Sequence, residues 1–285
     1  MSGVAIITDS IACLAREFVE QYQIGIVPIR IYFRDKIYRD WIDISPTEAY
    51  QLFLQDPERF NTSPASPGHY LEVYREVSNY ADSILCITLS SKLSTGYQMA
   101  CVAKEQAKTE LPHTSIEVLD SQTVTAAEGF IALAAARAAA AGKSLAEVTK
   151  LAEQIKEKVN FALLLETIRH VYRTGRIPKV AAQVGSLLNI KPILTMSSGL
   201  VHFAGAVRNR EHGMERIIKM LKDKVGRKPV HIAVMHAYAL EEAQKLMERL
   251  RSEFNCIELW LTEFSPVMGY ATGTGTIGFA YYVDD

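Results

Sequence analysis

Hydroxyl side chains gather in one short segment, where an apolar run gives way to the pattern of a helix. Residues 84–89 predict a buried strand and residues 97–108 predict a helix. The connection between them offers four hydroxyl groups, those of Ser90, Ser91, Ser94 and Thr95. Because the free backbone N–H groups at a helix start carry partial positive charge, this junction can hold a carboxylate or a phosphate. An ordinary helix N-cap, for which Ser and Thr are usual, is the alternative interpretation.

Two other apolar runs also end in polar residues and lead into predicted helices. Residues 4–7 are followed by Thr8, Asp9 and Ser10. Residues 118–119 are followed by Asp120 and Ser121. Strands that each feed a helix predict a doubly wound parallel sheet, whose ligands bind beyond the carboxyl ends of the strands. We therefore expect these polar side chains at one shared edge. Residues 61–68 show no periodicity and predict a loop.

The pattern changes near residue 158, which predicts two α/β domains. Residues 1–158 predict the N-terminal doubly wound parallel sheet, and residues 159–285 predict a C-terminal α+β domain with a mixed sheet that completes the ligand pocket. In the second part, residues 191–207 contain two apolar runs around a Ser-Ser-Gly turn, the signature of an antiparallel hairpin. Residues 230–262 read as a βαβ unit.

Composition narrows the classes of protein to which the chain can belong. Of its 285 residues 48% are hydrophobic, and the formal net charge of −1 argues against a surface that binds nucleic acid or an anionic membrane. The most membrane-like segment, residues 129–142, is shorter than the roughly 20 residues that span a bilayer, so we expect a buried alanine-rich helix. Because the start lacks a basic region and a cleavage site, we expect a cytoplasmic protein whose membrane contact is at most transient.

Metal and nucleotide motifs give little support to catalysis by this chain. The four cysteines form no CxxC pair, and the seven histidines form no HxxxH or HExxH arrangement. A GxxxxGK[ST] loop is absent. Residues 273–278 match GxGxxG, but they lead into the β-prone residues 279–282, where a dinucleotide fingerprint needs a helix. We therefore expect no metal, no cofactor and a bound substrate on which another protein acts.

Seven short motifs occur in the chain in a characteristic order. They are ITDS at 7–10, TSPASPG at 62–68, LSSKLS at 89–94, LDS at 119–121, TGRI at 174–177, LLNIKPIL at 187–194 and TGTG at 272–275. In these motifs the chain resembles the DegV family of bacterial lipid-binding proteins. The resemblance implies a two-domain α/β protein that buries a long-chain fatty acid. It further implies the acyl-binding subunit of a fatty acid kinase, which presents the carboxylate to a separate ATP-binding subunit that makes an acyl phosphate.

The resemblance also implies roles for individual residues. It assigns the carboxylate hydrogen bonds to Thr62 and Ser94, with Thr95 beside them. Further candidates for the headgroup network are Thr8, Asp9, Ser10, Ser91, Tyr270 and Thr272. In the family the arginine that matches Arg208 lies near the headgroup, where a guanidinium can steady a phosphoryl group. A solvated salt bridge is the alternative role for Arg208.

Two departures from the family pattern bear on function. Ala271 stands where the family has a histidine of the headgroup network, so either the carboxylate has fewer polar partners or Tyr270 substitutes. The glycine of the usual Ser-Gly-Thr-Tyr stands one residue later, at Gly96, and this shift can change the path of the loop. Two other functions remain open: a diverged lipid carrier or sensor without a kinase partner, and a hydrolase or acyltransferase with Ser94 as nucleophile. The second lacks a GxSxG elbow.

Overall fold

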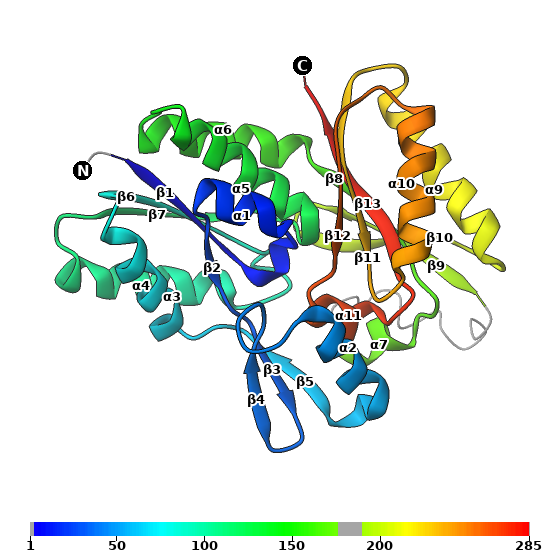
Figure 1. The fold of residues 1–285 in the computed structure, drawn as a ribbon, viewed down its shortest axis with the longest axis horizontal. Helices are drawn as coiled ribbons and strands as arrows, with labels where there is room; N and C mark the ends of the chain where they lie inside the picture. The colour runs from blue at the N-terminus through cyan, green and yellow to red at the C-terminus, as the bar shows by residue number, and fades with distance from the viewer. Residues whose placement is uncertain (1–2, 176–189, 285) are drawn as a thin grey trace.

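The computed structural model describes residues 3–175 and 190–284, which form three sheets covered by helices (Figure 1). The first is a parallel sheet in the order β2-β1-β6-β7. Its strands are β1 (Val4–Asp9), β2 (Gly25–Val27), β6 (Ser83–Thr88) and β7 (Ser115–Asp120). In the register Thr8 lies opposite Ile87 and Thr88 lies opposite Asp120, so the polar strand ends share one edge as predicted.

Helices cover both faces of this sheet because its strands are apolar on both sides. Ala5, Ile7 and Ile84 pack on the side of two helices, α3 (Pro67–Ser78) and α4 (Gly96–Glu110). Ile6 and Leu85 pack on the opposite side. The helices of that side are α1 (Arg16–Tyr22), α5 (Thr125–Ala140) and α6 (Leu145–Lys158). The predicted doubly wound parallel sheet is confirmed.

The second sheet is mixed and has the order β10-β9-β8-β13-β11-β12. Its strands are β8 (Asn160–Leu164), β9 (Lys191–Ser197), β10 (Leu200–Val207), β11 (Val230–His236), β12 (Cys256–Glu263) and β13 (Ile277–Val283). The helices of this part are α7 (Arg169–Thr174), α9 (Arg210–Val225), α10 (Leu240–Glu253) and α11 (Pro266–Thr272). The predicted hairpin is confirmed: Ser198 and Gly199, with φ of 50° and 78°, turn β9 into antiparallel β10. The predicted βαβ unit is β11, α10 and β12, with parallel strands.

The sequence analysis missed a third, antiparallel sheet in the order β4-β3-β5, which projects at the bottom of Figure 1. Its strands are β3 (Arg30–Phe33), β4 (Lys36–Arg39) and β5 (Phe60–Ser63). A helix, α2 (Pro46–Gln55), and a 3-10 helix (Pro57–Arg59) connect β4 to β5; another 3-10 helix (Ser10–Ala12) follows β1. The loop predicted at residues 61–68 is therefore wrong in part. Thr62 pairs with Ile31 of β3, and α3 begins at Pro67.

A shared core joins the two halves of the chain on either side of residue 158. Helix α5 is buried along most of its length, as expected from its alanine content, and it contacts both the parallel and the mixed sheet. The centre of the Phe130 ring lies 5.4 Å from the centre of the Trp260 ring and 5.1 Å from that of the Tyr282 ring. The boundary at residue 158 stays a prediction. Within residues 3–175 and 190–284, no helix is both long and apolar enough to cross a membrane.

The glycine-rich run near the C-terminus serves close backbone packing. It leads into β13, which is a strand. A dinucleotide-binding fingerprint requires a helix at that position, so the GxGxxG match is not such a fingerprint. A Cβ added to Gly278 would lie 2.0 Å from the carbonyl oxygen of Ala162 in the neighbouring strand. Gly273 and Gly275 have positive φ values of 90° and 79°, which a side chain would strain.

Candidate functional site

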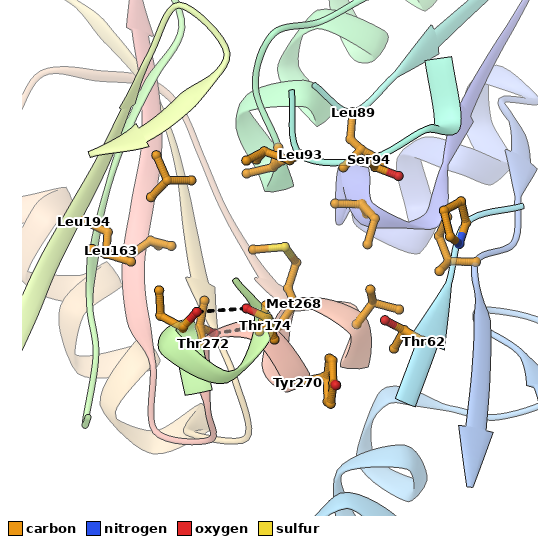
Figure 2. A pocket seen from close by; sticks show the side chains of 18 of the residues that line it. Thr62, Leu89, Leu93, Ser94, Leu163, Thr174, Leu194, Met268, Tyr270 and Thr272 are labelled. Atoms are coloured by element: carbon orange, nitrogen blue, oxygen red, sulfur yellow. Dashed lines mark hydrogen bonds between the residues drawn. The ribbon is translucent and has the colours of Figure 1, made fainter. Parts of the chain in front are cut away.

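A cavity lies between the two halves of the chain, beyond the carboxyl ends of β1 and β6 (Figure 2). Its empty volume, which includes the solvent space at its open mouth, is about 920 Å³. Most of its lining is apolar. The apolar side chains are Ile11, Ile29, Pro64, Leu89, Leu93, Val124, Phe161, Leu163, Val171, Leu194, Val201, Val267, Met268 and Ala271. The lining residues that the structure describes include no histidine, cysteine, carboxylate or basic side chain.

The polar groups of the lining are hydroxyls, and most of their protons are already donated. Ser63 donates to the Tyr32 hydroxyl at 3.1 Å. Thr174 donates to the carbonyl of Val171 at 3.1 Å, and Thr272 donates to the carbonyl of Met268 at 2.8 Å (Figure 2). These hydroxyls are committed to the protein itself, so they have little left to offer a ligand.

Thr62 and Ser94 differ from the other hydroxyls. The Thr62 hydroxyl makes no hydrogen bond to any residue that the structure describes. The Ser94 Oγ accepts the backbone N–H of Gly96 at 3.3 Å, and its own proton is donated to no described residue. In Figure 2 both lie on one side of the cavity, and Leu163 and Leu194 lie on the other. One end of the cavity thus offers two hydroxyl donors, and the far end is apolar.

Two further features favour an anion at the hydroxyl end. Ser94 precedes the first residue of α4, a 15-residue helix whose N-terminus carries partial positive charge. Tyr270 lines the same cavity, and the Arg173 guanidinium lies 4.8 Å from the centre of its ring. The Tyr270 hydroxyl is 3.4 Å from the side-chain oxygen of Asn61, next to Thr62 in β5. Tyr270 therefore lines the cavity close to Thr62, and its substitution for the family's histidine stays a prediction.

Asp9 positions the cavity wall from behind, without lining the cavity. Its carboxylate accepts the backbone N–H of Ile11 and that of Leu89, each at 3.0 Å. Both of these residues line the cavity. Ser10 acts in the same way, because its hydroxyl accepts the N–H of Ile29, another lining residue, at 3.2 Å. Burial raises the pKa of Asp9 to about 7.

A second buried carboxylate anchors α11, the helix that supplies much of the opposite wall. The Ser265 hydroxyl at the start of this helix donates to Asp40 at 2.5 Å, and its backbone N–H donates to the sulfur of Cys13 at 3.3 Å. Burial raises the pKa of Asp40 to about 6, against the lowering effect of hydrogen bonds from Ser265 and Ser10. The sequence analysis missed Asp40 and Ser265, because they are 225 positions apart and no local pattern marks them.

The remaining predicted headgroup residues lie away from the cavity. Thr8 is buried and donates to Glu128 at 3.1 Å. Ser91 donates to Asp120 at 2.5 Å. Thr95 is exposed at the start of α4, where its side chain makes no capping hydrogen bond. None of the three lines the cavity.

The predicted arginines are also dispersed. Arg208 is exposed just beyond β10 and does not line the cavity. Arg210 instead forms ion pairs with Glu166 and Glu242 and donates to the carbonyl of Gly275 at 2.6 Å, so it holds the glycine-rich segment. Arg176, the arginine of the TGRI motif, lies outside the described residues.

Comparison with known proteins identifies relatives along the whole chain. A model described as an uncharacterised protein of the DegV family matches residues 3–284. The protein DegV of Bacillus subtilis is 30% identical over 281 residues, which are 98% of this chain and 99% of that protein. A DegV domain-containing protein of Clostridium acetobutylicum is 31% identical over 285 residues, 99% and 98% of the two chains.

Solved structures share the fold. A DegV family protein from Thermus thermophilus, described for its fatty acid binding, has a TM-score of 0.89 and 30% identity over 99% of this chain and 100% of its own. DegV from Bacillus subtilis, described as a fatty acid binding protein, has a TM-score of 0.89 and 28% identity over the full length of both chains.

The substitution Asp40→Asn should change how the stability of the ligand-free protein depends on pH. The ordinary pKa of Asp, 3.8, rises to about 6 in the fold because of burial. The folded state then holds this proton more tightly, so the free energy of unfolding falls as pH rises from about 4 to about 6. An amide has no such proton. Relative to the unmodified protein, the variant should gain roughly 2–3 kcal/mol between about pH 4 and pH 7, measured by urea unfolding.

Asp43→Asn is the matched control. Asp43 lies three positions away, and its pKa is lowered by Arg39, so the sign of its pH dependence is reversed and screening by solvent keeps it small. Both variants leave the histidines unchanged, so the histidine contributions cancel in each difference. If the difference between Asp40→Asn and the unmodified protein were the same at every pH, the buried carboxyl would not have the raised pKa.

Proposed function

The chain belongs to the DegV family, and on this premise we propose that it binds a long-chain fatty acid in the cavity between its two halves. Two solved relatives, at 28% and 30% identity over the whole chain, are described as binding fatty acids. The observation that carries the proposal is the cavity itself: an apolar lining with two uncommitted hydroxyl donors, Thr62 and Ser94, at one end. This is the polarity of a fatty acid.

The energetics divide between the two parts of the ligand. Each buried methylene contributes about 0.8 kcal/mol, so the acyl tail supplies most of the affinity. A buried carboxylate costs several kcal/mol unless donors replace its water, and charge-assisted bonds from hydroxyls contribute about 1.5–3 kcal/mol each. Thr62 and Ser94 supply such donors, and the N-terminus of α4 adds to them. The tail therefore sets the affinity and the hydroxyls set the orientation.

A hydrolase or acyltransferase that uses Ser94 receives less support. A serine nucleophile needs a general base within hydrogen-bonding reach. In the part of the chain that the structure describes, no histidine or carboxylate lines the cavity with Ser94. The hydroxyl accepts a backbone N–H instead, which suits a residue that binds a carboxylate.

We further propose that the bound carboxylate is presented to a separate ATP-binding kinase subunit. The family resemblance suggests this role, and the position of the hydroxyl end supports it. Asn61, beside Thr62, and Thr95, beside Ser94, are both exposed, so a partner protein can approach the carboxylate end without crossing the core. A lipid carrier or sensor without a kinase partner uses the same cavity and is the second candidate.

Protein purified under native conditions should carry one fatty acid of about 14–18 carbons, because burial of the tail dominates the affinity. Mass spectrometry of a denatured organic extract measures the ligand, and native mass spectrometry measures its stoichiometry. An extract without fatty acid above the level of a mock purification, from protein that also fails to bind added palmitate, would contradict the proposal.

The double substitution Thr62→Val and Ser94→Ala should weaken palmitate binding roughly 100-fold, because it removes two hydrogen bonds to the carboxylate. Valine keeps the shape of threonine, so β5 and the cavity wall stay in place. Titration of ligand-stripped protein measures the affinity. The control is Ser91→Ala, since that hydroxyl donates to Asp120 outside the cavity. Equal affinity in the double variant and the unmodified protein would show that these hydroxyls do not hold the carboxylate.

If the kinase role is correct, acyl phosphate should form from the loaded protein and ATP only when an ATP-binding subunit from the same organism is added. Ala271→His should raise the single-turnover rate with little change in palmitate affinity, because the headgroup geometry governs the transfer and the tail governs binding. Absence of acyl phosphate with every ATP-binding subunit of that organism would favour the carrier or sensor. Fast transfer that the histidine does not improve would show that Tyr270 already serves.

A further inference from the structure

We propose that Val124 and Phe161 form a thin wall that limits the length of the acyl chain and separates it from a second, polar chamber. The inference deepens the proposed function and rests on it, since it concerns the far end of the same fatty acid. It makes Phe161 a specificity-determining residue for chain length. The wall also excludes acids that carry a second polar group at the far end.

The polar chamber lies where the end of β7, the end of α6 and the β9–β10 turn meet. Its empty volume, counted to its opening, is about 640 Å³. The side chains that give it its character are those of Gln122, Thr123, Lys156, Asn160 and Ser197. Thr123 is 5% exposed, and its hydroxyl makes no hydrogen bond to any described residue, so a polar ligand group entering the chamber would meet an uncommitted donor.

In three segments of the chain, a residue that lines the polar chamber is followed or preceded, one or two positions away, by a residue that lines the apolar cavity. Thr123 lines the chamber and Val124 lines the apolar cavity. Asn160 lines the chamber and Phe161 lines the cavity. On β9, Leu194 lines the cavity and Met196, on the same face of the strand, lines the chamber. The two spaces are therefore neighbours along these segments, and Val124 and Phe161 lie at the boundary between them.

Phe161 belongs to the side of the cavity that lies across from the carboxylate donors. Phe161 and Leu163 project from the same face of β8, and Ala162 between them packs into the core on the other face. In Figure 2, Leu163 lies across the cavity from Thr62 and Ser94. Phe161 and Val124 are each 3% exposed, so neighbouring residues cover most of both side chains. On our proposal, a chain that fills the cavity ends against them.

The chamber behind the wall should increase the affinity for an acid with a polar chain end. It should not increase the affinity for an acid with a longer alkyl chain. Methylene groups gain affinity only where they leave water for an apolar surface. The chamber offers the Lys156 ammonium, two amides and hydroxyls beside the Glu157 carboxylate, so it can form hydrogen bonds with a polar group at the chain end. Opening the wall should therefore change which class of acid the protein selects as well as the length that it accepts.

The test compares ligand-stripped unmodified protein with Phe161→Ala and with the milder Phe161→Leu. Saturated fatty acids that lengthen by two carbons at a time, and α,ω-dicarboxylic acids of the same lengths, are titrated into each. For the unmodified protein, affinity should rise about fourfold per methylene, equivalent to about 0.8 kcal/mol, and then stop rising. We call the chain length at which affinity stops rising the break. In the alanine variant the break should move to chains that are longer by at least two carbons. Long dicarboxylic acids should gain at least tenfold relative to monocarboxylic acids of equal length.

Phe279→Ala is the matched control. Phe279 is equally buried in the same sheet but packs on the opposite face, against the core of the C-terminal part, and does not line the cavity. It should leave the break and the preference for monocarboxylic acids unchanged. Thermal unfolding of each variant shows whether it is folded, and Phe161→Leu carries the test if the alanine variant is not.

The outcomes separate the two proposals. If the unmodified protein binds no acid of any length, the fatty acid function is wrong and the inference falls with it. If it binds fatty acids but the break stays at the same length in both Phe161 variants, the fatty acid function stands and the wall is wrong. A shift in length without any gain for dicarboxylic acids would overturn the role assigned to the chamber.

Discussion

The architecture of the cavity depends on a buried carboxyl group that has no basic partner among the residues that the structure describes. Asp9 ends the central strand β1 and accepts backbone N–H groups from Ile11 and from Leu89, which belong to the loops after β1 and β6. Those loops would otherwise leave N–H groups unpaired in the interior, which costs free energy. The cost of burying the carboxyl appears as its raised pKa. What it provides is a pair of hydrogen bonds that hold two residues of the cavity wall in place.

The opposite wall is held by the same kind of contact. Asp40 ends the projecting hairpin and binds Ser265 at the start of α11, so the smallest sheet is tied to the helix that closes the cavity. The Tyr50 hydroxyl reinforces the joint by donating to the carbonyl of Phe264 at 3.1 Å. Gly269 lets α11 approach the Tyr50 ring, since a Cβ at that position would lie 2.1 Å from it. Polar contacts behind both walls therefore leave the lining itself free to be apolar.

Because polar groups behind the walls hold the backbone in place, few polar groups are left to face the cavity. Many hydroxyl and carboxyl groups near the site form hydrogen bonds within the protein. The Ser91 hydroxyl donates to Asp120, and the Ser10 hydroxyl accepts the backbone N–H of Ile29. The two hydroxyls left over, on Thr62 and Ser94, therefore stand out against an apolar lining. A ligand that is apolar along its length and anionic at one end matches that distribution better than a ligand with several polar groups.

The sequence by itself determined most elements of the two larger sheets and the candidate residues, because these follow from local patterns, but it did not reveal the β4-β3-β5 sheet. Apolar runs followed by helical segments predicted the parallel sheet, and a Ser-Ser-Gly turn predicted the β9–β10 hairpin. Motifs in family order predicted Thr62 and Ser94 as carboxylate-binding residues, and both line the cavity. Only the tertiary structure decided what each hydroxyl does. Ser91 and Ser94 are three positions apart, yet one binds Asp120 and the other faces the cavity. The direction of a side chain depends on partners far away in the chain, as the pairing of Asp40 with Ser265 across 225 positions shows, and no local pattern records such partners.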